Sequence, residues 1–454
     1  MSDTSTAPYY QTDFPTEEFN TRRDRVLEQI GSESVAVLQG ASLTGGFDLF
    51  RQTNELYYLC GVEVPHVYLV IDGRNGKSCL YLPPRDPKNE KSEGASLSAD
   101  DVDLLRSLTG VDNVSPLADL AGDLSDATTI YTPHSPAEML QMCQDMLRHR
   151  NGAIAGDPNH RQSSREDDFI ALLTRYAPGA EIRDLSPVLN DLRVIKSPLE
   201  VGMMRRAGRL TALAVTEAMR STQPGLMEYH LGAVADYVYR AGGAWGGGYR
   251  PIVACGKNIW NAHYYRNNCE LVDGELVIVD YAPDVGCYTS DIGRIWPVGG
   301  TYSPLQRELY GFIVEYHKVL LQTIRPGEMA SAIMLEAAAK MKPIIESWEF
   351  SKPIYRDAAR RTLDFQGHLS HGVGMAVHDV GDYTAEVLRP GVVFALDPQM
   401  WVPEEQLYIR VEDTVAVTED GVENFTELAP LELDDVERVM TEEGMLQSFP
   451  PEVE

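Results

Sequence analysis

The chain has 454 residues, of which 43% are hydrophobic and 8% aromatic, as in ordinary folded globular proteins. One hydrophobic core rarely serves a chain of this length, so two domains are expected. The 68 acidic residues outnumber the 39 lysines and arginines, and the formal charge of −29 argues against nucleic acids and anionic membranes as partners.

The cysteines and the first residues bear on the cellular compartment. The six cysteines are scattered without a CxxC spacing, which favours reduced thiols over a disulfide framework. The N-terminal stretch has neither the basic region nor the apolar region of a signal peptide, and no run approaches 18 apolar residues. We therefore expect a cytoplasmic location.

The N-terminal part of the chain alternates short apolar strands with helical stretches. We expect helices at residues 17–30, 100–108 and 137–148, and a buried strand at 34–40. This alternation predicts an α/β domain with a mixed or parallel sheet. Because clustered ionisable residues are few here, we expect this domain to shape, assemble or cover a site.

The alternation stops near residues 185–187, where long helices begin. Ser197 is a suitable N-cap for a helix over 198–219, with Glu200 at its third position. Strands are expected from residue 252 onward, with further helices at 227–240, 304–325 and 329–347. We therefore place an N-terminal α/β domain with a mixed sheet at residues 1–185 and an α+β domain at 186–454.

Two aspartates, Asp280 and Asp291, lie in apolar segments that predict the two strands of a hairpin. If Ala282 pairs with Cys287 across the turn, Asp280 lies opposite Thr289, and Asp291 lies on the same face two residues further on. Such a diagonal pair has Cα atoms roughly 7–8 Å apart. Two carboxylates on one buried face repel each other unless a cation lies between them.

Further candidate ligands follow, each at a strand end or in a glycine-rich turn: one of the histidines His368, His371 and His378, together with Asp397 and Glu412. Taken singly, each has an ordinary explanation as a loop histidine, a cap or a surface ion pair. One imidazole with four carboxylates, however, suits hard or borderline divalent ions such as Mn²⁺. Two divalent ions would neutralise the four negative charges, so we predict a two-metal site, which is suited to amide hydrolysis.

Several segments, in order, resemble metallopeptidase family M24, which includes aminopeptidase P, prolidase and methionine aminopeptidase and has the pita-bread fold. The resemblance rests on the eleven-residue interval from Asp280 to Asp291 and on SHGVGMAVHD, PGVVFALDP and IRVEDTVAVTEDGVENFT. It extends to FRQTNELYYLCGVEVPHVYLVI and LYLPPRDP, which resemble the N-terminal domain of aminopeptidase P. The resemblance implies that residues 186–454 form a pita-bread catalytic domain.

The resemblance also implies a metal-ligand role for five residues. Asp280 would chelate one ion, Asp291 and Glu412 would bridge both ions, and His371 and Asp397 would hold the second ion. The metal is expected to be Mn²⁺, with Zn²⁺ or Co²⁺ as alternatives.

Four residues are implied to act on the substrate or on the ligands. His378 would hydrogen-bond the substrate carbonyl and the developing oxyanion, a task that needs only a well-placed donor. His263 would lie near the proline side of the substrate, and Arg410 would brace the bridging glutamate or meet the substrate. Asp397 stands where the family has a glutamate that is expected to accept a proton from the attacking water.

Two positions depart from the family pattern. Asp397 is one methylene shorter than the usual glutamate, which could shift the second ion or lower peptidase activity. The family histidine four residues before His371 falls on Gly367, and His368 is displaced by one place. These changes lie at the rim where substrate would bind.

The resemblance predicts an exopeptidase that releases the N-terminal residue of peptides with proline in second position. The alternatives are an Xaa-Pro dipeptidase, a small-metabolite hydrolase of the same fold, and a metal-binding scaffold with weak activity. The family relation also implies a homodimer or homotetramer.

Overall fold

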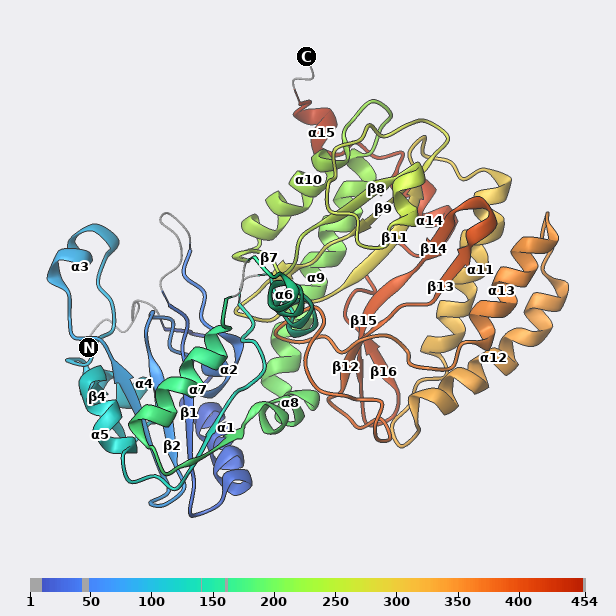
Figure 1. Cartoon of the computed structure of the whole chain (residues 1–454). Helices are drawn as coiled ribbons and strands as arrows, with labels where there is room; N and C mark the ends of the chain where they lie inside the picture. Colours follow the sequence, from blue (N-terminus) through green and yellow to red (C-terminus); the bar gives the residue numbers. More distant parts are fainter. Residues whose placement is uncertain (1–9, 43–48, 140, 160–161, 452–454) are drawn as a thin grey trace. The chain divides into compact units, whose positions relative to one another are not determined.

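The computed structural model describes residues 10–42, 49–139, 141–159 and 162–451 (Figure 1). Contacts within the chain divide it into two compact units, Met1–Arg193 and Val194–Glu454. Each unit has its own sheet and its own helices. Within the described ranges, none of the helices is both long enough and apolar enough to cross a bilayer.

The N-terminal unit is built on a mixed sheet with strand order β4-β3-β2-β1-β5-β6. Strand β2 pairs antiparallel with both β1 and β3, whereas the other neighbouring strands pair parallel, so β2 alone of these six strands runs in the opposite direction. Its strands are β1 (Val35–Gln39), β2 (Tyr68–Asp72), β3 (Lys77–Leu82), β4 (Asn113–Pro116), β5 (Thr129–Thr132) and β6 (Glu181–Asp184). Val35, Val37 and Ile130 of this sheet form a core with Phe169 and Leu173 of α7. The predicted α/β class with a mixed sheet is confirmed.

The helices of this unit follow the predicted pattern with one exception. They are α1 (Thr16–Ile30), α2 (Asn54–Cys60), α3 (Pro87–Glu93), α4 (Val102–Thr109), α5 (Leu120–Leu124), α6 (Gln144–Gly156), α7 (Arg165–Tyr176) and α8 (Ser186–Val194), with a short 3₁₀ turn at Leu117–Asp119. The helix predicted at 137–148 begins only at Gln144. Glu138 instead lies in an irregular connection, where its carbonyl oxygen accepts a hydrogen bond from the backbone N–H of Asn54 and its carboxylate pairs with Arg193 at 2.8 Å.

The C-terminal unit contains an antiparallel sheet with order β12-β15-β11-β9-β8, and β16 also pairs with β15. The strands of the unit are β7 (Gly246–Gly247), β8 (Ile252–Cys255), β9 (Leu276–Asp280), β10 (Pro283–Asp284), β11 (Ile292–Pro297), β12 (Val393–Leu396), β13 (Gln399–Val402), β14 (Leu407–Arg410), β15 (Glu412–Val417) and β16 (Val422–Asn424). Strands β13 and β14 form a separate hairpin.

Helices cover this sheet and the β13–β14 hairpin. They are α9 (Pro198–Ser221), α10 (Glu228–Ala241), α11 (Pro304–Leu321), α12 (Ala330–Ser347), α13 (Pro353–Asp364), α14 (Leu433–Val439) and α15 (Met445–Ser448), with 3₁₀ turns at Gly256–Trp260 and Pro403–Glu405. Helix α9 packs on α10 and β11, whereas α11 and α13 pack on the hairpin (Figure 1). The predicted start of α9 is confirmed, because Ser197 and Glu200 form a capping box.

The predicted hairpin register around Asp280 is wrong. Strands β9 and β11 do pair antiparallel, but Asp280 lies opposite Gly293 rather than Thr289. The connection is wider than predicted because Pro283 and Asp284 leave the hairpin and pair with β7. Asp291 is two residues from Gly293, so the two aspartates still share one face of the sheet.

Candidate metal centre

Neighbouring strand ends deliver the four predicted carboxylates to one region. Asp280 is the last residue of β9, Glu412 is the first of β15, and both pair with Gly293 on the strand between them. Asp291 immediately precedes β11, and Asp397 immediately follows β12. A side chain at Gly293 would be crowded, because its Cβ would lie 3.1 Å from Glu412 Cβ and Oε2. The glycine therefore leaves room for the side chains of Glu412 and Arg410.

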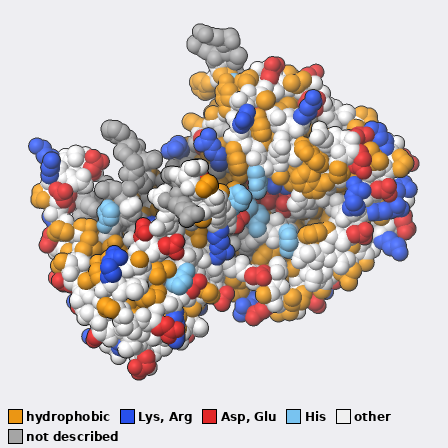
Figure 2. All heavy atoms as spheres, in the orientation of Figure 1, with side chains coloured by type: hydrophobic (Ala, Val, Ile, Leu, Met, Phe, Trp, Pro, Cys, Tyr) orange, Lys and Arg blue, Asp and Glu red, His pale blue; other side chains and the backbone are white. Residues whose placement is uncertain are grey.

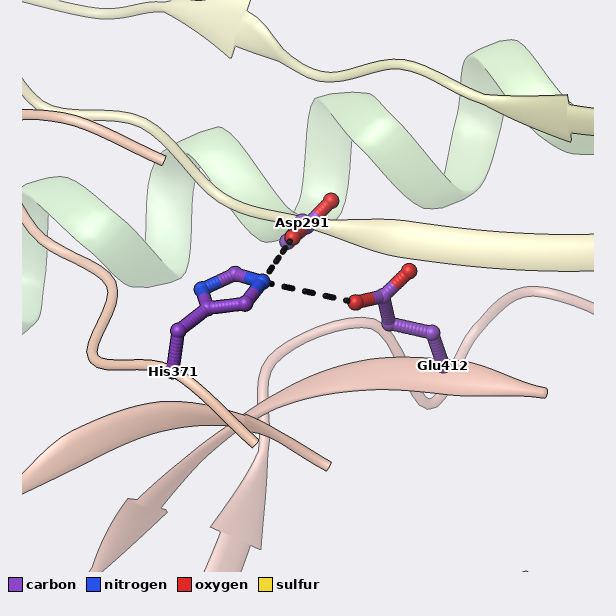
Figure 3. A group of neighbouring side chains, drawn as sticks. All are labelled: Asp291, His371 and Glu412. Atoms are coloured by element: carbon purple, nitrogen blue, oxygen red, sulfur yellow. Dashed lines mark ion pairs between the residues drawn. The ribbon is translucent and has the colours of Figure 1, made fainter. Parts of the chain in front are cut away.

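Asp291, His371 and Glu412 form the tightest group at this site (Figure 3). His371 Nε2 lies 3.4 Å from Asp291 Oδ2 and 3.8 Å from Glu412 Oε1. One potential ligand atom from each of the three residues lies within 4.8 Å of the other two. A histidine and two carboxylates from three separate segments thus converge at a distance that suits one ion between them.

The protonation of His371 matches a ligand role. Burial, and then the neighbouring His378, lower the pKa of His371 to about 3, so the ring is neutral at neutral pH. Its Nδ1 lies 3.2 Å from the Gly372 carbonyl oxygen and donates to it when it carries the ring proton. The lone pair of Nε2 then faces two carboxylates, which is unfavourable without a cation between them.

Arg410 ties Asp280 and Asp397 to this group. Its guanidinium forms an ion pair with Asp280, lies 3.2 Å from Glu412 Oε2, and approaches Asp397 Oδ1 at 3.9 Å. Arg410 thus lies beside Glu412 as well as Asp280. One guanidinium cannot balance four carboxylates, and burial raises the pKa values of Asp397 and Glu412, that of Glu412 to about 7. The site is short of positive charge.

The unsatisfied oxygens at the site fit divalent ions. Asp397 Oδ1 and both carboxylate oxygens of Glu412 are buried and accept no hydrogen bond from the residues that the structure describes. Buried acceptors of this kind are normally paired. Oxygen and imidazole ligands without thiolates suit Mn²⁺ or another borderline divalent ion. The residues present therefore fit the metal that the sequence predicts, while the predicted role of each ligand stays a prediction.

Tyr249 is a site residue that the sequence did not predict. Its hydroxyl oxygen lies 2.8 Å from Asp280 Oδ1 and 2.7 Å from Asp291 Oδ1, so the hydroxyl links the two aspartates. Burial and the nearby carboxylates raise the pKa of Tyr249, which keeps the hydroxyl protonated. In the sequence, only the glycine run that precedes Tyr249 marks this place. In the structure the glycine is needed, because a Cβ on Gly248 would lie 2.3 Å from Thr289 Oγ1.

The predicted substrate histidines lie next to the cluster. The ring of His378 lies 4.1 Å from that of His371 and 6.1 Å from that of His263, measured between centroids. A buried ion pair between Lys196 and Asp379, at 3.0 Å, anchors the loop after His378. In the space-filling view, histidine side chains gather on one face of the molecule beside acidic side chains (Figure 2).

Asp413 serves the fold on the side opposite to Glu412, as its alternation along β15 predicts. Its carboxylate lies 2.7 Å from Arg294 Nη2 and 3.1 Å from His317 Nε2, and all three side chains are buried. These partners lower the pKa of Asp413 despite its burial. Asp413 therefore already has a buried cationic partner, Arg294, within the chain.

A cavity of about 490 Å³ lies beside Asp397. Its wall combines apolar side chains of α11, α12 and α13 with residues of the loop before His371 and of β13. The lining residues are Tyr316, Leu320, Met334, Ala358, Arg361, Thr362, Phe365, His368, Leu369, Ser370, Asp397, Pro398, Gln399 and Trp401. His368 contacts Phe365 edge to face, with ring centroids 5.2 Å apart.

Comparisons with known proteins agree with this geometry. Residues 202–419 match metallopeptidase family M24, and residues 19–132 match the aminopeptidase P N-terminal domain. The chain is 31% identical to mouse Xaa-Pro aminopeptidase 3, covering 93% of this chain and 85% of that protein. It is 30% identical to Xaa-Pro aminopeptidase of Escherichia coli strain K12, covering 93% and 97% respectively.

A solved structure extends the similarity to the fold. The E. coli aminopeptidase P structure with the inhibitor Pro-Leu superposes with a TM-score of 0.76 at 27% identity, covering 95% of this chain and 99% of that one. At 95% coverage the match extends over both units. The fold, the clustered carboxylates and histidine, and the extent of these similarities together show that the chain belongs to metallopeptidase family M24, with an aminopeptidase P N-terminal domain.

Proposed function

We propose that this chain is a dinuclear metal-dependent Xaa-Pro aminopeptidase, which hydrolyses the first peptide bond of substrates with proline in second position. The observation that carries the proposal is the convergence of Asp291, His371 and Glu412, with Asp280 and Asp397 joined to them through Arg410. The Xaa-Pro aminopeptidase names of the relatives and the matching N-terminal domain support it.

The ligand set supports two ions, which we propose are Mn²⁺. Four carboxylates and Arg410 leave a net charge of −3, and one divalent ion offsets only part of it. Asp280 would hold one ion, His371 and Asp397 the other, and Asp291 and Glu412 would bridge them. The ions would lower the pKa of a water molecule and polarise the substrate carbonyl.

The side chains around the ligands would perform the remaining steps. Asp397 would accept the proton that the attacking water loses, and His378 would donate a hydrogen bond to the oxyanion. Arg410 would hold Asp280 and Glu412 in place. His263 would contact the substrate on its proline side, and the cavity beside Asp397 offers apolar walls to a substrate side chain.

The proposal extends to the location of the protein in the cell and to its assembly. We propose a cytoplasmic enzyme that forms a homodimer or homotetramer, with residues 1–185 as the N-terminal domain and 186–454 as the catalytic domain. Light scattering on the purified protein would measure the assembly. A monomer at micromolar concentration would refute that part.

A non-peptidase hydrolase of the same fold is the second candidate, because Asp397 and Gly367 both depart from the family pattern near the cavity. The deciding experiment compares hydrolysis of Xaa-Pro-Yaa peptides with that of Xaa-Pro dipeptides, after loading with Mn²⁺ and again after chelation. Chelator-sensitive cleavage of the longer peptides supports the aminopeptidase, and cleavage of dipeptides alone supports a dipeptidase. Bound metal without either activity would favour a metabolite hydrolase or a weakly active scaffold.

A further inference from the structure

Asp397 receives a hydrogen bond from a side chain two residues further along the chain. Gln399 Nε2 donates to Asp397 Oδ2 at 3.2 Å. The other oxygen, Asp397 Oδ1, is buried, accepts no hydrogen bond from the described residues, and faces Arg410 Nε at 3.9 Å. One oxygen of this carboxylate is thus held, and the other is left for the cluster.

The amide of Gln399 is itself oriented. Trp401 Nε1 donates to Gln399 Oε1 at 2.9 Å. An indole N–H can only donate, so the Gln399 oxygen must face Trp401 and its NH₂ group must face Asp397. The Trp401 ring is in turn held between aromatic neighbours, with its centroid 4.1 Å from that of Tyr408 and 5.0 Å from that of Trp260.

The backbone places Gln399 where it can connect both sides of the site. Strands β13 and β14 pair with Gln399 opposite Arg410, the arginine that joins the other carboxylates. The Gln399 carbonyl oxygen also accepts a hydrogen bond from Thr362 Oγ1 of α13 at 3.0 Å. Gln399 is therefore fixed at its main chain as well as at its side chain.

We infer that Gln399 is a positioning residue that orients the short Asp397 carboxylate toward the metal centre, and that Trp401 sets the direction of the Gln399 amide. The inference rests on the proposed metal-dependent function. An aspartate reaches less far than a glutamate at the same position, so its carboxylate needs a fixed orientation to reach an ion. Hydrogen bonds to metal ligands typically change metal affinity about 10–100-fold.

Calorimetric titration of the metal-free full-length protein with Mn²⁺ tests this inference. Gln399→Met keeps the length of the side chain but cannot donate, and it should weaken one of the two Mn²⁺ sites about 10–100-fold. Trp401→Phe should weaken the same site to a smaller extent. Gln366→Met is the matched control, because Gln366 is exposed and makes none of these contacts, and it should bind Mn²⁺ as the unaltered protein does.

Repeating the titration in Asp397→Glu protein separates a positioning role of Gln399 from a general effect of its substitution on folding. In Asp397→Glu protein the carboxylate lies one methylene farther out, so adding Gln399→Met should change Mn²⁺ affinity less than twofold. Metal-free Gln399→Met protein should still unfold in one cooperative transition, at a melting temperature a few degrees below that of the control, because two part-buried hydrogen bonds are lost. Equal affinity losses in both backgrounds, or unchanged affinity in Gln399→Met protein, would overturn the inference.

The outcomes also distinguish this inference from the proposed function. Two Mn²⁺ sites in the unaltered protein, one of them lost in Asp397→Ala but retained in Gln399→Met, would overturn the role of Gln399 and leave the metal centre standing. An unaltered protein that binds no Mn²⁺ would overturn both.

Discussion

Removing the Tyr249 hydroxyl tests the geometry of the acidic cluster directly. In Tyr249→Phe protein, Asp280 and Asp291 lose the group that lies 2.8 and 2.7 Å from their Oδ1 atoms. The Tyr249 side chain is only 7% exposed, so water cannot readily replace the hydroxyl. A hydrogen bond to a charged group contributes about 1.5–3 kcal/mol. The free energy of unfolding of the metal-free variant should therefore be about 1.5–3 kcal/mol lower than that of the unaltered protein.

The same change should weaken metal binding, because the hydroxyl fixes the separation of two predicted ligands. We expect about a 10–100-fold loss of Mn²⁺ affinity by calorimetry. Guanidinium unfolding in the presence of a chelator gives the stability difference. Tyr302→Phe is the matched control, because its buried hydroxyl donates to a backbone carbonyl, that of Ile295, away from the cluster. Tyr249→Phe protein with unchanged Mn²⁺ affinity, or with a stability within about 0.5 kcal/mol of the unaltered protein, would refute the reasoning.

Three further changes probe other features. Gly293→Ala places a Cβ 3.1 Å from Glu412, so it should lower the free energy of unfolding by about 1–3 kcal/mol and should also lower Mn²⁺ affinity. Gly122→Ala is the control and should lower neither, because a Cβ there meets open space. Asp291→Asn should lose Mn²⁺ affinity as well as turnover; unchanged metal content by elemental analysis would place the bridge elsewhere. Burial and the charge of Glu138 raise the pKa of Glu55 to about 7, so the folded state holds a proton that the unfolded state releases above about pH 4.5. The stability that protonated Glu55 contributes is therefore lost as pH rises from about 4.5 to 7. In Glu55→Gln protein the free energy of unfolding should change less with pH over this range, and identical pH dependence in the two proteins would contradict the prediction.

Features set by nearby residues could be predicted from the sequence. The start of α9 follows from Ser197 and Glu200, which act within one turn of helix. The family and the side chains of the cluster could also be predicted, because their order along the chain carries the information.

Features set by distant pairing could not be predicted. The register of Asp280 depends on Pro283 and Asp284 pairing with β7, which lies more than 30 residues earlier in the chain. Tyr249 and Gln399 were missed because a lone tyrosine or glutamine has no spacing pattern that marks it. Their contacts exist only once separate strands and loops have come together.

The adjacent acids of β15, Glu412 and Asp413, differ in the source of the positive charge that balances them: side chains of the protein for Asp413, and the proposed metal ions for Glu412. Asp413 has Arg294 and His317 as partners that no chelator can remove. Folding can therefore set the position of β15 before any ion arrives, and this places Glu412, the next residue, at the site in advance. If metal binds as proposed, it would bind to strands already in place, so an enzyme that loses its metal would keep its strand order and could take up metal again without refolding.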